Sequence, residues 1–135
     1  INQIGLTRKI GKNWVGHIHW SAKGLMKNQG GISTALAKSY TQPVAVPPMP
    51  WISKAIPDQA QVGATTSGSD TRIRWTVPPS ASKVAVQARY GKNWRTVAIV
   101  PAGAGSISIP KADVIAVSTL NRYGNSSAQL VLGLR

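Results

Sequence analysis

The sequence contains very few acidic residues: three aspartates, Asp58, Asp70 and Asp113, and no glutamate. Most hydrolytic and acid–base chemistry uses a carboxylate as base, nucleophile, metal ligand or partner of a histidine. Asp58 lies in a proline-rich connector, Asp70 in a Gly/Ser loop and Asp113 just before a predicted strand, and none has an acidic neighbour in sequence. We therefore predict that this segment carries no catalytic residue and no cofactor.

Cysteine is also absent, which excludes disulfides and thiol chemistry but leaves the redox compartment open. No apolar run approaches the ~20 residues that a membrane-spanning helix needs. We therefore expect contact with a membrane only through a lipid anchor outside this segment. The chain opens on Ile1 without a methionine or a signal peptide, and we interpret it as a segment of a longer polypeptide.

Basic residues, in contrast, are abundant: 16 lysines and arginines give a net charge of +13. Such a charge attracts polyanions, which include nucleic acid, anionic glycans and lipid surfaces. The sequence has no RNP-like, helix-turn-helix or zinc-finger pattern, and its longest basic run is Arg8-Lys9. An anionic polysaccharide is therefore the expected partner, and no specific nucleic acid is expected.

The chain divides into two halves joined by a connector, residues 41–60, that holds five of the nine prolines. Beyond the connector, short alternating runs are separated by Gly, Ser, Pro and Asn, which is typical of an all-β sandwich. Seven strands match the immunoglobulin/fibronectin count. Trp75 and Val117 are predicted inside, and Arg72 and Arg74 outside. The predicted strands are Gln61–Thr65, Arg72–Val77, Lys83–Tyr90, Arg95–Val100, Ser106–Ile109, Val114–Asn121 and Ala128–Leu134.

The first half has the pattern of an α/β unit. Ile4 and Leu6–Ile10 predict the end of a helix, and Val15–Trp20 is a short, β-branched apolar run that predicts a buried strand. Ser21 follows directly and can cap a helix over Ala22–Lys27 through its hydroxyl. Asn28, Gly30 and Gly31 end that helix, and a second helix places Ile32, Ala35, Leu36 and Tyr40 on one face. One strand makes no sheet, so this half must pack into something larger.

Residues 15–51, VGHIHWSAKGLMKNQGGISTALAKSYTQPVAVPPMPW, resemble a known family. These are the glycoside-hydrolase-10-like lipoproteins of bacteria, which carry a C-terminal fibronectin type III-like domain. The later run VIAVSTLNRYGNSS is similar to the sixth strand of a fibronectin-type module, although Ile115 replaces the tyrosine usual there. The residues that carry the likeness are Gly16, Trp20, Ser21, Ala22, Lys23, Pro43, Pro47, Pro48, Met49, Pro50 and Trp51.

The resemblance implies that residues 1–50 are the last strand and helices of a (β/α)₈ barrel with the connector, and residues 51–135 a fibronectin type III-like sandwich. It implies that the catalytic carboxylates sit on earlier strands, at the C-terminal face of the barrel. The remainder of the barrel, in the same polypeptide, would then be a partner of this segment. The resemblance also implies export and a bacterial cell-envelope location, as a periplasmic or outer-membrane lipoprotein.

The same resemblance places His19, Trp20, Ser21 and Lys23 where the last barrel strand meets its helix, the face at which barrels bind substrate. Trp20 can stack on a sugar ring or pack as core, and Lys23 can pair with a substrate carboxylate or remain solvated. His17 and His19 form an H-x-H pair, but no further metal ligand is near in sequence, so no metal site is predicted.

A second candidate set, Tyr90, Trp94 and Arg95, flanks a predicted hairpin turn at Gly91–Asn93. Aromatic rings interleaved with cations suit binding of a glycan or of single-stranded nucleic acid. Trp94 can equally stabilise the hairpin by cross-strand packing.

Two functions fit these observations. In the first, the segment is the C-terminal part of an exported glycoside hydrolase acting on envelope polysaccharide, with peptidoglycan-type strands favoured because their lactyl carboxylates attract a polycation. In the second, it is a non-catalytic basic module that binds anionic glycan or, less favoured, nucleic acid.

Overall fold

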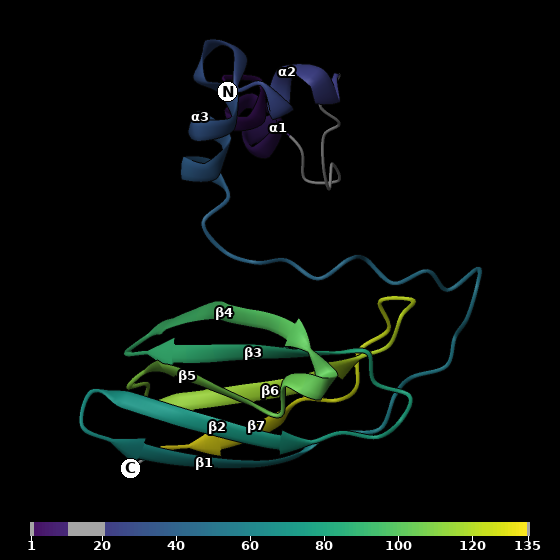
Figure 1. The fold of residues 1–135 in the computed structure, drawn as a ribbon, viewed down its shortest axis with the longest axis vertical. Helices are drawn as coiled ribbons and strands as arrows, with labels where there is room; N and C mark the ends of the chain where they lie inside the picture. The colour runs from purple at the N-terminus through teal and green to yellow at the C-terminus, as the bar shows by residue number, and fades with distance from the viewer. Residues whose placement is uncertain (1, 11–20, 135) are drawn as a thin grey trace. The chain divides into compact units, whose positions relative to one another are not determined.

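The computed structural model describes residues 2–10 and 21–134 (Figure 1). It divides into two compact units, Ile1–Thr41 and Gln42–Arg135. The predicted boundary lay between residues 50 and 51, whereas the structure groups residues 42–50 with the second unit. The predicted strand Val15–Trp20 lies outside the described residues, so the barrel remains a prediction. Among the described residues, no helix is long and apolar enough to cross a membrane.

The first unit contains three short helices, α1 (Asn2–Ile10), α2 (Ala22–Met26) and α3 (Ile32–Ser39), and a 3-10 turn, η1 (Gln29–Gly31). Each helix predicted from the sequence is present. Ser21 is the N-cap of α2 in an extended conformation, but its side chain makes no capping hydrogen bond. The predicted hydroxyl cap is therefore wrong, because the Ser21 carbonyl itself accepts the Gly24 N–H at 3.2 Å.

Asn28 ends α2 and also begins α3. Its backbone is left-handed, with φ of 48°, which a short polar residue tolerates. Its side-chain oxygen accepts hydrogen bonds from the Ser33 and Thr34 N–H groups at 2.9 and 3.3 Å. These donors belong to the first turn of α3, where N–H groups have no partner within the helix. A single asparagine therefore joins the two helices.

The second unit is a sandwich of two antiparallel sheets (Figure 1). Its three-stranded sheet has the order β1-β2-β5 and its four-stranded sheet the order β4-β3-β6-β7. This is a mainly β, seven-strand fold that resembles a fibronectin type III domain, as the alternating runs predicted. The strands are β1 (Gln61–Ser67), β2 (Asp70–Thr76), β3 (Lys83–Tyr90), β4 (Asn93–Pro101), β5 (Ser106–Pro110), β6 (Val114–Leu120) and β7 (Leu130–Gly133).

The core lies between the two sheets and follows the alternation of the sequence. Along β2, Ile73 and Trp75 are buried while Arg72 and Arg74 are exposed, as predicted. Trp75 is 7% exposed, and its indole N–H donates to the Ala102 carbonyl at 3.0 Å. The wide apolar ring is therefore placed inside without an unpaired polar atom. The remaining core is aliphatic: Ala60, Val84, Val86, Ala88, Ala98, Ile109, Ala112, Ile115 and Val117.

The turn between β3 and β4 is a two-residue hairpin at Gly91-Lys92, since Tyr90 pairs with Asn93. Gly91 has a φ of 61°, and a glycine at the first central position is the requirement of a type II′ turn. The Gly91 N–H donates to the Asp113 carboxylate at 2.6 Å. Asp113 therefore has a structural role, because it fixes this hairpin to the start of β6.

The proline-rich connector is part of the sandwich. Residues 42–48 line a cavity of about 450 Å³ together with side chains of the four-stranded sheet, so this stretch lies over the outer face of that sheet. The Gln42 side-chain oxygen accepts the Thr96 N–H at 3.2 Å, and the Tyr123 carbonyl accepts the Met49 N–H at 2.9 Å. The outer-face residues Ala116, Ser118 and Leu120 are correspondingly buried.

The loop between β6 and β7 holds the end of the connector. The buried Asn125 amide donates to the Ser53 and Ala55 carbonyls at 2.9 and 2.8 Å. The Asn121 amide donates to the same Ala55 carbonyl at 2.8 Å, and the Thr119 hydroxyl donates to the Asp58 carbonyl at 2.7 Å. We call Thr119, Asn121 and Asn125 the connector clamp. Proline removes backbone donors, so these side chains supply the hydrogen bonds that fix the connector.

Candidate functional site

The first set of predicted site residues is only partly within the described structure. Ser21 and Lys23 lie at the start of α2, and both are exposed. His19 and Trp20 lie outside the described residues, as does His17. The substrate-binding role of this set therefore stays a prediction.

The second set, Tyr90, Trp94 and Arg95, is divided between the two faces of the four-stranded sheet. Directly paired residues share a face, and Trp94 pairs with Arg89 whereas Arg95 pairs with the buried Ala88. Tyr90 lies on the same side as Ala88, and its hydroxyl donates to the Pro110 carbonyl at 3.3 Å. Tyr90 and Arg95 therefore do not share a surface with Trp94.

The aromatic–cation pair that the structure brings together is Trp94 and Arg89, on the outer face of the sheet. The guanidinium carbon of Arg89 lies 6.0 Å from the centre of the Trp94 ring, at the limit of a cation–π contact. Trp94 is 46% exposed, which is high for a residue with so large an apolar surface. The indole is therefore available to a ligand.

Arg89 carries an unusual feature for an arginine at a surface. Its Nε atom is buried and has no hydrogen-bond partner. An unpaired buried donor is costly to the fold, and because this atom has almost no solvent access, a ligand would reach Arg89 only through the terminal nitrogens of its guanidinium. An oxyanion on those nitrogens would form charge-assisted hydrogen bonds.

Amide side chains continue the same face beyond Trp94 and Arg89. Gln87 lies next to Arg89 on the outer side of β3, two residues earlier in the strand. Its side-chain oxygen accepts a hydrogen bond from the Gln129 amide at 2.8 Å. Thr96 pairs with Gln87, and its N–H donates to the Gln42 amide oxygen. We call Arg89, Trp94, Gln87 and Gln42 the outer platform. An aromatic ring, a cation and amides on one surface are groups that suit a carboxylated sugar.

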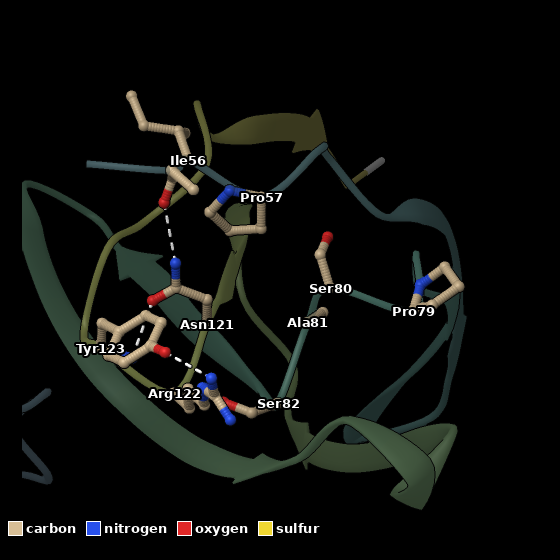
Figure 2. A pocket seen from close by; sticks show the side chains of 10 residues that line it. Ile56, Pro57, Pro79, Ser80, Ala81, Ser82, Asn121, Arg122 and Tyr123 are labelled. Atoms are coloured by element: carbon tan, nitrogen blue, oxygen red, sulfur yellow. Dashed lines mark hydrogen bonds between the residues drawn. The ribbon is translucent and has the colours of Figure 1, made fainter. Parts of the chain in front are cut away.

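A separate pocket of about 400 Å³ lies where the connector meets the loops after β2 and β6 (Figure 2). Figure 2 shows the rings of Pro57 and Pro79 at its walls, with Ser80 between them and Arg122 and Tyr123 at its edge. The Arg122 guanidinium lies 4.7 Å from the centre of the Tyr123 ring and also donates to its hydroxyl. Most polar groups here are thus already paired, which favours a structural role for this pocket.

Two of the three aspartates, Asp58 and Asp113, lie at opposite ends of β6. Asp58 bonds through its carbonyl to Thr119 near the end of β6, whereas Asp113 directly precedes β6. Six residues of extended strand separate those positions by about 20 Å. The carboxyl pair of a glycosidase is ~5–9.5 Å apart. Asp58 and Asp113 therefore cannot act together as a glycosidase pair.

Two features escaped the sequence analysis. The resemblance of residues 114–127 to a fibronectin strand does not reveal the connector clamp, although the two asparagines on either side of a glycine in NRYGN are typical of a hydrogen-bonded loop. Arg89 was treated as a neighbour of the hairpin, although alternation along a strand already places Trp94 and Arg95 on opposite faces. The pairing of Arg89 with Trp94 required the register of the two strands.

No sequence family matches this chain, and no curated relative was found. Among solved structures, the chain is similar to the spore cortex lytic enzyme SleM of Clostridium perfringens, with 17% identity and a TM-score of 0.45. It is also similar to a Fn3-like protein from Clostridium thermocellum, with 18% identity and a TM-score of 0.43. Each similarity covers 58% of this chain, and 28% of the lytic enzyme or 93% of the Fn3-like protein. The chain thus spans well under a third of the lytic enzyme, and the fibronectin-like description rests on the strand order of the sandwich itself.

Proposed function

We propose that this segment binds anionic polysaccharide of the bacterial cell envelope, as the C-terminal, non-catalytic part of an exported glycoside hydrolase. The observation that carries the proposal is the exposed Trp94 ring beside the Arg89 guanidinium on the outer platform. A sugar ring stacks on the indole through its C–H face, while a carboxylate on that sugar bonds to the guanidinium.

Charge supports an anionic ligand over a neutral one. The sandwich unit, residues 42–135, holds ten of the 16 basic residues and all three aspartates, and residues 1–41 hold no acidic residue. Both units therefore contribute to a positive field that concentrates polyanions near the surface. Cell-wall glycan stripped of its peptides carries a lactyl carboxylate on alternate sugars, which makes it the favoured polymer.

The proposal that this segment belongs to a glycoside hydrolase is supported by the connector residues VAVPPMPW, which carry the family resemblance. The packing of the connector against the sandwich is consistent with it. A connector that is fixed to the sandwich by the clamp would restrict the distance between the sandwich and the proposed barrel more than a flexible linker would. In this proposal the reaction belongs to the barrel portion of the same polypeptide, at the envelope, and the sandwich holds the glycan near it. Ser21 and Lys23, with His19 and Trp20, would contact substrate on the barrel side.

Replacing Trp94 with alanine should weaken binding of peptide-free cell-wall glycan roughly tenfold, because one stacking contact is on the order of 1.4 kcal/mol. Arg89→Gln should weaken it to a similar extent, since the guanidinium carries the charge that meets the carboxylate. The dissociation constants can be measured by isothermal titration calorimetry with fragments of defined length.

Matched controls are Trp51→Ala, at a tryptophan that is 78% exposed but lies in the connector, and Lys83→Gln, which removes one exposed charge. Both should bind as the unaltered chain does. Equal losses of glycan affinity in Trp51→Ala and Trp94→Ala would contradict the proposed role of the outer platform. Carboxyl-reduced glycan should bind Arg89→Gln and the unaltered chain equally.

A further inference from the structure

The connector lies over the outer face of the four-stranded sheet and leaves a space beneath it. This cavity, between residues 42–48 and the sheet, has a volume of about 450 Å³, within the range of roughly 300–1,000 Å³ for small-ligand sites. Val44 and Val46, in the middle of this stretch, are 84% and 56% exposed, so most of their surface faces solvent. The connector therefore bounds the cavity without filling it, and we call the space the connector groove.

The floor of the connector groove is formed by small and apolar side chains. Ala85 of β3 pairs with Ile99 of β4 and with Ser118 of β6, and Leu120 lies two residues beyond Ser118. Directly paired residues project from the same face of a sheet, and all four of these residues line the groove. A methyl group that entered the groove would be removed from water by Ala85, Ile99 and Leu120.

Ser118 places one polar group among these apolar side chains. The residue is 8% exposed, and its hydroxyl has no hydrogen-bond partner in the part of the chain that the structure describes. The hydroxyl is not sealed off, because Arg89 Nε is the one unpaired side-chain atom in that part that has lost almost all contact with solvent. A buried hydroxyl normally has a partner, so an acceptor in the groove would complete the hydrogen bonding of Ser118.

Two glutamine amides lie at the edge of the connector groove. The Gln129 amide group donates to the Gln87 side-chain oxygen at 2.8 Å. Among the described residues, this leaves the Gln87 amide nitrogen and the Gln129 side-chain oxygen without a partner. Both side chains line the groove, so its edge offers one donor and one acceptor.

The groove continues directly from the outer platform. Gln87 and Arg89 are two residues apart on β3, which is about 7 Å along a strand. Their partners on β4 follow the same order, since Thr96 pairs with Gln87 and Trp94 with Arg89. A glycan whose carboxylated sugar contacts Trp94 and Arg89 therefore brings its neighbouring sugar to the edge of the groove.

These groups together match one common substituent of sugars, the acetamido group. From its outer end inward, this substituent has a methyl group, a carbonyl acceptor and an N–H donor. The methyl group fits the floor beside Ala85 and Leu120, the carbonyl accepts from the Ser118 hydroxyl, and the N–H donates to the Gln129 side-chain oxygen. A hydroxyl substituent would be too short to cover the floor, and an ammonium group would be repelled by the net charge of +13.

We propose that the connector groove is a subsite for an acetamido sugar, next in the glycan to the carboxylated sugar on the outer platform. The inference rests on the proposed function for the placement of the glycan. The acetamido group itself is recognised by Ser118, Gln129 and the apolar floor, without Trp94 or Arg89. The two sites together would select a polymer in which acetamido and carboxylated sugars are neighbours.

The test compares chitotetraose with cellotetraose, two neutral tetrasaccharides that differ only in carrying an acetamido group or a hydroxyl on each sugar. Their dissociation constants are measured on the full chain by NMR titration. Chitotetraose should bind at least about tenfold more tightly, because a buried methyl group and a hydrogen bond both contribute. Equal affinity of the unaltered chain for the two sugars would overturn the subsite.

Two variants assign the preference to the groove. Ser118→Ala should lower the ratio of the two affinities about fivefold, since one neutral hydrogen bond is lost. Ala85→Leu fills the groove and should bring the ratio close to one. The matched control is Ser108→Ala, at an exposed serine of β5 in the other sheet, and it should keep the full ratio. A full ratio in Ser118→Ala and Ala85→Leu, or an equal loss in Ser108→Ala, would overturn the assignment.

The neutral probes keep this result separate from the proposed function, which concerns a carboxylate. The proposed function is tested by the carboxylated glycan against its carboxyl-reduced form. Loss of the carboxylate preference together with an intact acetamido ratio would contradict the proposed function alone. A carboxylate preference without an acetamido ratio would contradict the subsite alone.

Discussion

Replacing Trp75 with alanine should lower the free energy of unfolding of the sandwich by about 4 kcal/mol, within the usual range for a buried aromatic side chain. Trp75 is 7% exposed and packs against both sheets through the aliphatic core. The substitution leaves a cavity and also leaves the Ala102 carbonyl without the indole N–H. Urea titration followed by far-ultraviolet circular dichroism measures the loss.

The matched control is Trp51→Ala, because Trp51 is a tryptophan of the same unit that is 78% exposed. Its free energy of unfolding should stay within about 0.5 kcal/mol of the unaltered chain. Similar losses in the two variants would mean that the assignment of Trp75 to the core is wrong.

Gly124→Ala should detach the connector and destabilise the sandwich by roughly 3 kcal/mol, the upper end of the cost of a strained backbone residue. Gly124 has a φ of 82°, and a Cβ placed there would lie 2.7 Å from the carbonyl oxygens of Val46 and Pro47. Those oxygens belong to the connector backbone, which has no flexible side chain to move aside. Relief therefore requires that the connector leave the loop.

Hydrogen exchange resolves where the structure opens. Amides of the connector, such as that of Met49, which donates to Tyr123, should lose protection, while the core strands retain theirs. Gly103→Ala is the matched control, because its Cβ would meet nothing within 4 Å and its φ is not positive. If Gly124→Ala left the protection of the connector intact, the packing of residues 46 and 47 on the loop would be contradicted.

The sandwich was predictable because its signals are local. Alternation of Ile73 and Trp75 with Arg72 and Arg74 needs only the period of two of a half-buried strand. The hairpin turn at Gly91 is likewise encoded in two residues. Strand ends differed from the predictions by one or two residues, where hydrogen-bond pairing and not side-chain pattern sets the limit.

The outer platform was not predictable, because a bulge inverts one end of β4. Val86 pairs with Ala98 but Gln87 pairs with Thr96, so Val97 is the extra residue. Strict alternation back from the buried Ala98 would place Trp94 inside and Arg95 outside. The bulge turns Trp94 outward beside Arg89, and no sequence pattern marks it.

The contacts of the connector were not predictable for a related reason. Prolines and the absence of periodicity predict a linker, and they carry no sign of what the segment contacts. Its partners, Asn121 and Asn125, lie more than sixty residues away in the sequence. Contacts between residues so far apart in sequence form only when the strands have assembled into the sandwich, which brings the loop after β6 to the connector.

One titration tests the proposal that the chain recognises the charge of a carboxylated glycan. Binding of the unaltered chain to peptide-free cell-wall glycan and to the same glycan after carboxyl reduction is measured from about 50 to about 500 mM salt, a range over which screening becomes strong. We expect tight binding of the carboxylated polymer that weakens steeply with salt, and weak, salt-independent binding of the reduced polymer. Equal affinity for the two polymers, unchanged by salt, would contradict it.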